Sequence, residues 1–328
     1  MMMMTSCSSS NKEDELKNEN EMIDELLISL PTGSFWNDKI YKCKGFWCPS
    51  VILLGVISCE QKHFELAAAD DIILASLPKS GTTWLKALIF SVVNRNRFKP
   101  ENSPLLTANP HDLVPFLEVP GLANDHNLNA GGVLDDDQHP RVLSTHLHYP
   151  LLPPSVKDSK CRIVYVCRNP LDTLISYFHF QEMLPKDEAN ENVQPTLSSI
   201  HEAYFKYYEE KPEKVLFIKY EDLKEDVVSQ LKLLAKFLMF PFTAKEEAQG
   251  LVEEIAKMCS LDNLKNLEVN KRGTLRKIKE IPTNSFFRKA EVGDYVNHLT
   301  PSMIENFEKL MQDKFGRSGL VFKASHKV

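Results

Sequence analysis

The sequence predicts an α/β fold, a single domain in which a central parallel sheet is flanked by helices. Short runs of β-branched and apolar residues alternate along the chain with longer segments whose apolar residues recur at helical spacing. No internal repeat and no low-complexity linker interrupts residues 60–320, which favours one domain over two. This alternation is typical of parallel sheets, which bind ligands beyond the carboxyl ends of their strands.

Four short runs predict the strands of this sheet: 71–76, 141–145, 162–167 and 214–220. The most apolar run of the chain, 51–57, is far too short to span a bilayer and is expected to be a further strand.

Helices are expected between and after these strands. One carries Trp84, Leu85, Leu88, Ile89 and Val92 at helical spacing. A second runs from Pro170, capped by Asn169, to Phe180, and a third covers 223–238. A C-terminal helix begins after Thr300 and stops at Gly316, and an N-terminal one is closed by Pro31. The aromatic residues between 35 and 47 are either core packing or the wall of an apolar pocket.

Composition narrows the class of protein. The 328 residues carry 39 Lys and Arg against 45 Asp and Glu, a net charge of −6, which gives no electrostatic footprint for nucleic acid. A local basic pocket for a small anion remains compatible with this charge. The seven cysteines lack metal-site spacing, so reduced buried thiols in a reducing compartment are expected.

The N-terminus lacks the basic start and apolar core of a secretory signal. Residues 1–20 are expected to form a disordered tail before a domain spanning 21–328, and the protein is expected in the cytoplasm without a membrane partner.

The loop Pro78-Lys79-Ser80-Gly81-Thr82-Thr83-Trp84 lies between a predicted strand and a predicted helix. Free backbone N–H groups and the helix dipole at such a turn suit a phosphate or sulfate. Gly81 allows close approach of the backbone, the hydroxyl side chains donate hydrogen bonds, and Lys79 adds a charge. A capped helix start with an incidental lysine is the structural alternative. The nucleoside-triphosphate P-loop pattern is absent, which argues against a kinase or NTPase.

Polar residues follow two other predicted strands. His146 comes directly after 141–145, and a neutral imidazole there is suited to deprotonating a hydroxyl near pH 7. His148 is expected to be a bystander. Arg168 follows 162–167 and can grip a phosphate, with a surface salt bridge as the alternative. Arg288 and Lys289 stand beside a glycine turn and fit an anion clamp, although exposed basic loops are common.

Together these motifs resemble the cytosolic sulfotransferase family, in particular its plant branch, over about residues 60–322. The resemblance implies the P-loop-like sulfotransferase fold and the donor 3′-phosphoadenosine 5′-phosphosulfate (PAPS). It also implies an acceptor hydroxyl on a small lipophilic metabolite such as a phenol, flavonoid or steroid. No metal is expected to be required, and monomer and homodimer both stay open.

The same resemblance implies roles for individual residues. Lys79, Ser80, Gly81, Thr82 and Thr83 correspond to the 5′-phosphosulfate loop, and Trp84 and Tyr220 to adenine contacts. Arg168 and Ser176 correspond to ligands of the 3′-phosphate, and Arg288, Lys289 and Ala290 to a second clamp on it. His146 corresponds to the catalytic base, and Lys79 is expected to stabilise charge on the leaving nucleotide.

Four departures from the family pattern affect these expectations. Ala290 and Tyr295 replace a Gly and a Trp of the clamp motif, and Cys259 replaces a Thr near the nucleotide. Residues 181–212 form a shorter, acidic version of a segment that shapes the acceptor pocket in relatives. An active sulfotransferase is therefore the leading hypothesis. The alternative is a relative with impaired catalysis that binds PAPS or its product 3′-phosphoadenosine 5′-phosphate (PAP).

Overall fold

The computed structural model describes residues 25, 27–35, 38–61, 70–118, 140–183, 205–206, 208–275, 281–316 and 319–322. Its central sheet is parallel, in the order β5-β4-β6-β7. The strands are β4 (Ile72–Ser76), β5 (Val142–Thr145), β6 (Arg162–Cys167) and β7 (Val215–Lys219). The predicted α/β class and all four predicted strands are confirmed.

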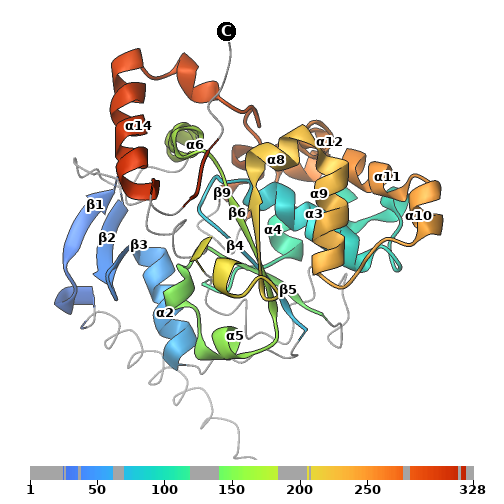
Figure 1. The fold of residues 1–328 in the computed structure, drawn as a ribbon, viewed down its shortest axis with the longest axis horizontal. Helices are drawn as coiled ribbons and strands as arrows, with labels where there is room; N and C mark the ends of the chain where they lie inside the picture. The colour runs from blue at the N-terminus through green and yellow to red at the C-terminus, as the bar shows by residue number, and fades with distance from the viewer. Residues whose placement is uncertain are drawn as a thin grey trace, which may run out of the picture.

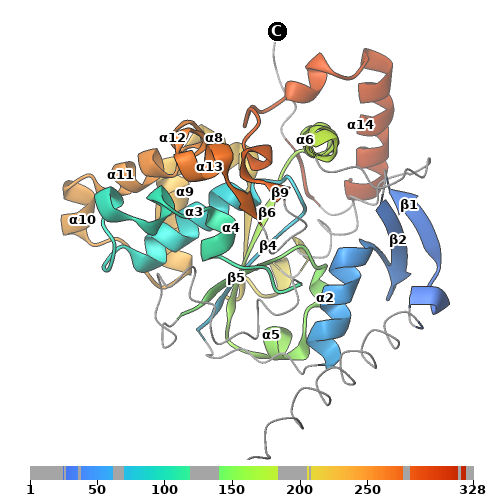
Figure 2. The ribbon, with the colours of Figure 1, turned by 180° about the vertical axis from the view of Figure 1, so that it is seen from behind.

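Both faces of this sheet are buried, as expected for parallel strands covered by helices. Along β4, Ile72 and Leu74 enter one apolar core while Ile73 and Ala75 enter the other. Helices α3 (Thr82–Asn94), α9 (Val227–Phe237) and α11 (Leu251–Met258) cover the first face, and α2 (Ser50–Gln61) and α5 (Pro154–Asp158) cover the second (Figures 1 and 2).

The prediction of a strand at 51–57 is wrong, because this run forms most of α2. A short apolar run has no periodicity that separates a buried strand from a buried helix. Leu53 and Val56 of α2 are fully buried against the sheet. A small antiparallel sheet precedes the helix, with β1 (Thr32–Phe35), β2 (Asp38–Cys43) and β3 (Phe46–Pro49).

Two aromatic residues of the stretch 35–47, Tyr41 and Phe46, pack from the small sheet toward the interior. Tyr41 is buried in the second core, and Phe46 packs against His148 with ring centroids 4.3 Å apart. Of the two readings of this stretch, core packing is the one that these residues follow.

The predicted helix 223–238 is two helices, α8 (Tyr220–Glu225) and α9. The chain breaks at Asp226, which has φ −143° and accepts a hydrogen bond from the Ser229 N–H at 3.0 Å. An aspartate cap of this kind competes with continuation of the preceding helix.

The remaining described elements follow. Helices are α4 (Pro110–Leu113), α6 (Pro170–Met183), α10 (Ala244–Ala248), α12 (Leu261–Asn266), α13 (Glu268–Arg272) and α14 (Pro301–Phe315), and β8 (Thr274–Leu275) pairs with β9 (Ile281–Pro282). The predicted caps are confirmed: Asn169 accepts from Leu171 N–H at 2.9 Å and Thr300 from Met303 N–H at 3.3 Å.

Some predictions lie outside the described residues. These include the tail 1–20, the side chains of Cys7 and Cys59, and residues 184–204 of the shortened segment. The five described cysteines are buried and form no disulfide with one another, as expected for reduced thiols. Within the described part of the chain, no helix is long and apolar enough to cross a membrane.

Candidate active site

The carboxyl ends of the four parallel strands converge on one cavity of about 500 Å³. It is lined by nearly all of the predicted site residues: Lys79, Gly81, Thr82, Thr83, Trp84, His146, Arg168, Ser176, Tyr220, Arg288, Lys289 and Ala290. Ser80 is the exception, because its buried hydroxyl lies 3.5 Å from that of Thr173 instead of lining the cavity.

The loop between β4 and α3 has the backbone of an anion-binding turn. Lys79 and Gly81 both have positive φ, +67° and +105°, so the backbone turns tightly before the helix starts. Gly81 is required here, since a methyl group on it would lie 2.8 Å from the ring of Tyr220. The hydroxyl of Thr82 is tied to that of Ser76 at 2.7 Å, which anchors the first turn of α3 to β4.

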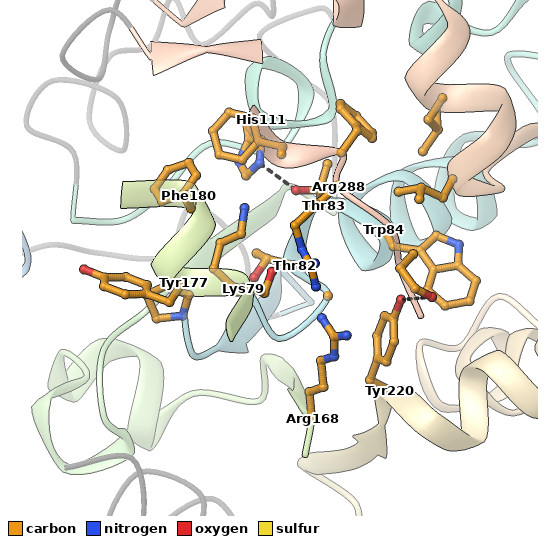
Figure 3. A pocket seen from close by; sticks show the side chains of 18 of the residues that line it. Lys79, Thr82, Thr83, Trp84, His111, Arg168, Tyr177, Phe180, Tyr220 and Arg288 are labelled. Carbon is orange, nitrogen blue, oxygen red and sulfur yellow. Dashed lines mark hydrogen bonds between the residues drawn. The ribbon is translucent and has the colours of Figure 1, made fainter. Parts of the chain in front are cut away.

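Three cations surround the space in front of this loop (Figure 3): Lys79, Arg168 and Arg288. Burial, with Arg168 and Arg288 nearby, lowers the pKa of Lys79 to about 7. The Nε atoms of both arginines and Nε1 of Trp84 are buried without a hydrogen-bond acceptor in the described part of the chain. An anionic ligand with several oxygens would satisfy these donors and offset the clustered positive charge.

The basic residues of the segment 288–289 are held in place by a buried carboxylate, that of Asp294. Asp294 accepts hydrogen bonds from Arg288 and from Lys289, the latter at 2.8 Å. These bonds lower the pKa of Asp294 far below its usual range, although burial opposes them. Arg168 donates to the backbone carbonyl of Glu291 at 2.6 Å, which joins the two arginine-bearing segments.

Tyr220 links the loop to the same part of the chain. Its hydroxyl donates to the Ala290 carbonyl at 3.1 Å, and its ring meets Trp84 edge to face at a centroid distance of 5.7 Å. Arg168 lies over the Tyr220 ring at 4.6 Å. The faces and edges of these rings, with the guanidinium beside them, offer stacking and edge contacts of the kind that a purine base makes.

His146 sits after β5 in the protonation state that a general base needs. Its Nδ1 lies 2.8 Å from the Ser76 carbonyl oxygen. A carbonyl only accepts, so Nδ1 carries the hydrogen and Nε2 keeps a lone pair. Burial lowers the pKa of His146 to about 4, which leaves the ring neutral at pH 7. The arrangement can remove a proton from a bound hydroxyl.

A buried polar cluster behind His146 was not foreseen from the sequence: Lys86, His111 and Glu118. Glu118 Oε1 accepts from the His146 backbone N–H at 2.6 Å, and burial raises the pKa of Glu118 to about 7. A lysine among the apolar positions of α3 was the available signal, since a lysine is almost never fully buried without partners.

Several residues that the sequence singled out do not line the cavity. Cys259 is fully buried with its sulfur 3.3 Å from the Ser91 hydroxyl, so it packs in the core and does not line the cavity. Tyr295 is also buried away from it, packed against Leu171 and Ile175 of α6. His148 packs against Phe46. Among the described residues, no group of His, Cys, Asp and Glu side chains is arranged to hold a metal ion.

The chain matches known proteins along most of its length. Residues 69–319 match the sulfotransferase domain family. Cytosolic sulfotransferase 15 of Arabidopsis thaliana is 42% identical over 324 residues, covering 92% of this chain and 87% of the relative. Flavonol 3-sulfotransferase of Flaveria bidentis is 39% identical over 324 residues, covering 92% of this chain and 100% of the relative.

Solved structures agree with this assignment. A crystal structure of an Arabidopsis thaliana sulphotransferase is similar with a TM-score of 0.67 and 35% identity, covering 91% of this chain and 94% of that one. A mouse sulfotransferase complexed with PAP gives 0.60 and 26%, covering 85% and 96%. The protein is therefore a member of the sulfotransferase family, and its curated relatives with about 40% identity are plant enzymes named cytosolic or flavonol sulfotransferases.

Proposed function

We propose that this sulfotransferase uses PAPS as its donor and transfers the sulfuryl group to a hydroxyl of a small lipophilic metabolite. One observation carries the donor assignment: Lys79, Arg168 and Arg288 meet around the loop after β4, and the Nε atoms of both arginines are buried without an acceptor among the described residues. Two separated phosphate-type groups and a purine fit this arrangement of loop, arginines and aromatic pair. The similar mouse sulfotransferase was solved with PAP.

In this proposal, residues of the loop 78–84 and the residues Arg168, Ser176 and 288–289 bind different parts of PAPS. Lys79, Thr82, Thr83 and the backbone N–H groups at the start of α3 bind the 5′-phosphosulfate. Arg168, Ser176, Arg288 and Lys289 bind the 3′-phosphate, and Trp84 and Tyr220 flank the adenine.

The transfer step uses His146 and Lys79. Nε2 of His146 takes the proton of the acceptor hydroxyl while the oxygen of that hydroxyl forms a bond to sulfur. The bond between sulfur and the bridging oxygen breaks in line, and the electron pair remains on the 5′-phosphate of PAP. The Lys79 ammonium, whose pKa is raised by the bound anion, stabilises that charge. No metal is assigned to the step.

The acceptor side of the cavity is apolar and aromatic. Phe116, Phe180 and Phe286 line it together with Ile52 of α2. Flat aromatic walls near His146 favour a planar phenolic acceptor, and two relatives are flavonol sulfotransferases from Flaveria species. We therefore place flavonols first in the range of acceptors.

Two measurements test the proposal in sequence. Binding of PAP without Mg²⁺ is expected, and the labelled sulfuryl group of PAPS should appear on flavonols in preference to steroids and simple phenols. Failure to bind PAP contradicts the donor assignment. PAP binding without transfer to any acceptor would instead support a nucleotide-binding relative with impaired catalysis.

The role of His146 has its own test. His146→Ala should lower kcat by about 10²–10⁴-fold, because a general base contributes that much, while the Kd for PAP stays unchanged. Unchanged turnover with intact PAP binding would show that His146 is not the base.

A further inference from the structure

Lys86 is a fully buried lysine that does not line the cavity. Its Nζ donates to the Val114 carbonyl at 2.7 Å, lies 3.0 Å from Nδ1 of His111 and stands 3.4 Å from the ring centre of Phe116. All three neighbours offer electron density to an N–H group. The Val114 carbonyl and the Phe116 ring take two of its N–H groups, and a charged Lys86, which has only hydrogens to offer, directs the third to His111 Nδ1.

His111 connects this lysine to the loop 78–84, called the donor loop because we propose that it binds the sulfuryl donor. It stands in α4 between Lys86 and Thr83, and its Nε2 lies 2.9 Å from the Thr83 hydroxyl oxygen (Figure 3). Burial lowers the pKa of His111 well below its usual range, so the ring is neutral and carries one N–H. Because Nδ1 accepts from Lys86, that single N–H is on Nε2 and donates to Thr83.

The direction of the hydrogen bonds from Lys86 through His111 decides whether the Thr83 hydroxyl meets a ligand as a donor or as an acceptor. Its hydroxyl oxygen already accepts from His111, so the hydroxyl hydrogen is turned toward another acceptor. Thr83 lines the cavity, and among the described residues His111 is the hydrogen-bond partner of its hydroxyl. A hydroxyl held in this way meets an anion as a donor, without first reorienting.

We propose that Lys86 and His111 are positioning residues that hold the Thr83 hydroxyl as a hydrogen-bond donor to the oxyanion of the donor substrate. The proposal rests on the PAPS site proposed above. Neither residue touches the substrate in this scheme: both act through Thr83.

A matched pair of substitutions at His111 tests whether its Nε2 donates to the Thr83 hydroxyl. In His111→Gln the side-chain amide nitrogen reaches the place of Nε2 and can still donate to Thr83, whereas His111→Asn ends near Nδ1 and cannot. We expect kcat/KM for PAPS to fall about ten- to a hundredfold in His111→Asn, the range for a hydrogen bond to a charged group, and to be largely retained in His111→Gln. Equal losses in the two variants would overturn the proposal.

Thr83→Val supplies the second arm. It should lose a similar factor, and adding His111→Asn to it should cost nothing further, because the bond through which His111 acts is already gone. Independent, multiplying losses would mean that His111 serves packing alone. Thermal unfolding of each variant checks that it is folded.

The tautomer of His111 gives a readout that does not involve activity. The ¹⁵N shifts of its ring, identified by their absence in His111→Gln, should show Nε2 protonated and Nδ1 unprotonated. A ring protonated on Nδ1 overturns the proposal even if PAPS is the donor. Conversely, a wild-type protein that binds no PAP would contradict the donor assignment while leaving the tautomer measurable.

Discussion

At the scale of single residues, the donor loop places a lysine where burial and two arginines oppose its charge. The pKa of Lys79 is lowered to about 7, so in the free protein the side chain is cationic below that pH and neutral above it. An anion binds the cation better. Affinity for PAP should therefore fall as pH rises above 7, by at most about tenfold per unit.

Lys79→Arg is the matched variant, since a guanidinium stays charged across this range. The Kd for PAP measured between pH 7.5 and 9, where the phosphates are already ionised, should rise for the wild type and stay flat for the variant. A flat wild-type profile would contradict the lowered pKa of Lys79.

Ala290, which also lines the cavity, has a strained backbone conformation. Its φ of +54° lies in the left-handed region, where a side chain costs about 1 kcal/mol, and its carbonyl accepts from Tyr220. Ala290→Gly should raise the free energy of unfolding by roughly 0.5–1 kcal/mol, seen in denaturant titration. Ala248→Gly in the exposed helix α10 is the control and should lower it by a similar amount. Destabilisation by Ala290→Gly would show that the side chain contributes contacts that outweigh the strain.

At the scale of elements, α2 approaches the acceptor side of the cavity through one glycine. A methyl group at Gly55 would lie 2.3 Å from Cα of Glu118 and 2.6 Å from its carbonyl oxygen. Gly55→Ala must separate the two backbones, and overpacking of this kind costs about 1–3 kcal/mol of stability. Because Glu118 also accepts from the His146 N–H, kcat should fall as well.

Gly33→Ala is the comparison for this change, since the nearest atom to its added methyl is a ring carbon of Trp47 at 3.3 Å. Its effect on the thermal midpoint should be much smaller than that of Gly55→Ala. Equal midpoints for the two variants would mean that α2 can shift freely against Glu118.

Strands and helices differed in how well the sequence predicted them. The four central strands were predictable because each is an apolar run buried on both faces, and the caps Asn169 and Thr300 mark helix starts by local chemistry. The run 51–57 was misassigned because every residue in it is apolar or glycine, so no polar face reveals the helical period.

The site divided in the same way. His146 and Arg168 follow predicted strands directly and Lys79 stands three residues after one, so the topology of a parallel sheet brings them to one edge. Lys86, His111 and Glu118 lie inside or between elements, and their contacts arise only from tertiary packing. The side-chain hydroxyl of Ser80 lies toward Thr173, a direction that the sequence of a turn with positive φ on both sides does not reveal.

At the scale of the whole molecule, the cavity is a junction of segments that are distant in the chain. Lys79 follows β4, Arg168 follows β6, Tyr220 begins α8, and Arg288 comes from the C-terminal part. The arginines and Lys79 repel each other in the free protein, so a bound anion joins these segments and removes the repulsion. Ligand binding should therefore appear as stability of the whole domain.

PAP at 100 times its Kd should raise the free energy of unfolding by about 2.7 kcal/mol and the thermal midpoint by several degrees. AMP at the same concentration lacks the 3′-phosphate and should raise the midpoint much less. In Arg288→Met the shift with PAP should shrink toward that with AMP, because the clamp on the 3′-phosphate is lost. Lys309→Met, which removes an exposed cation of α14 paired with Glu305, should leave both shifts unchanged. Equal shifts with PAP and AMP in the wild type would mean that Arg168 and Arg288 do not bind a 3′-phosphate.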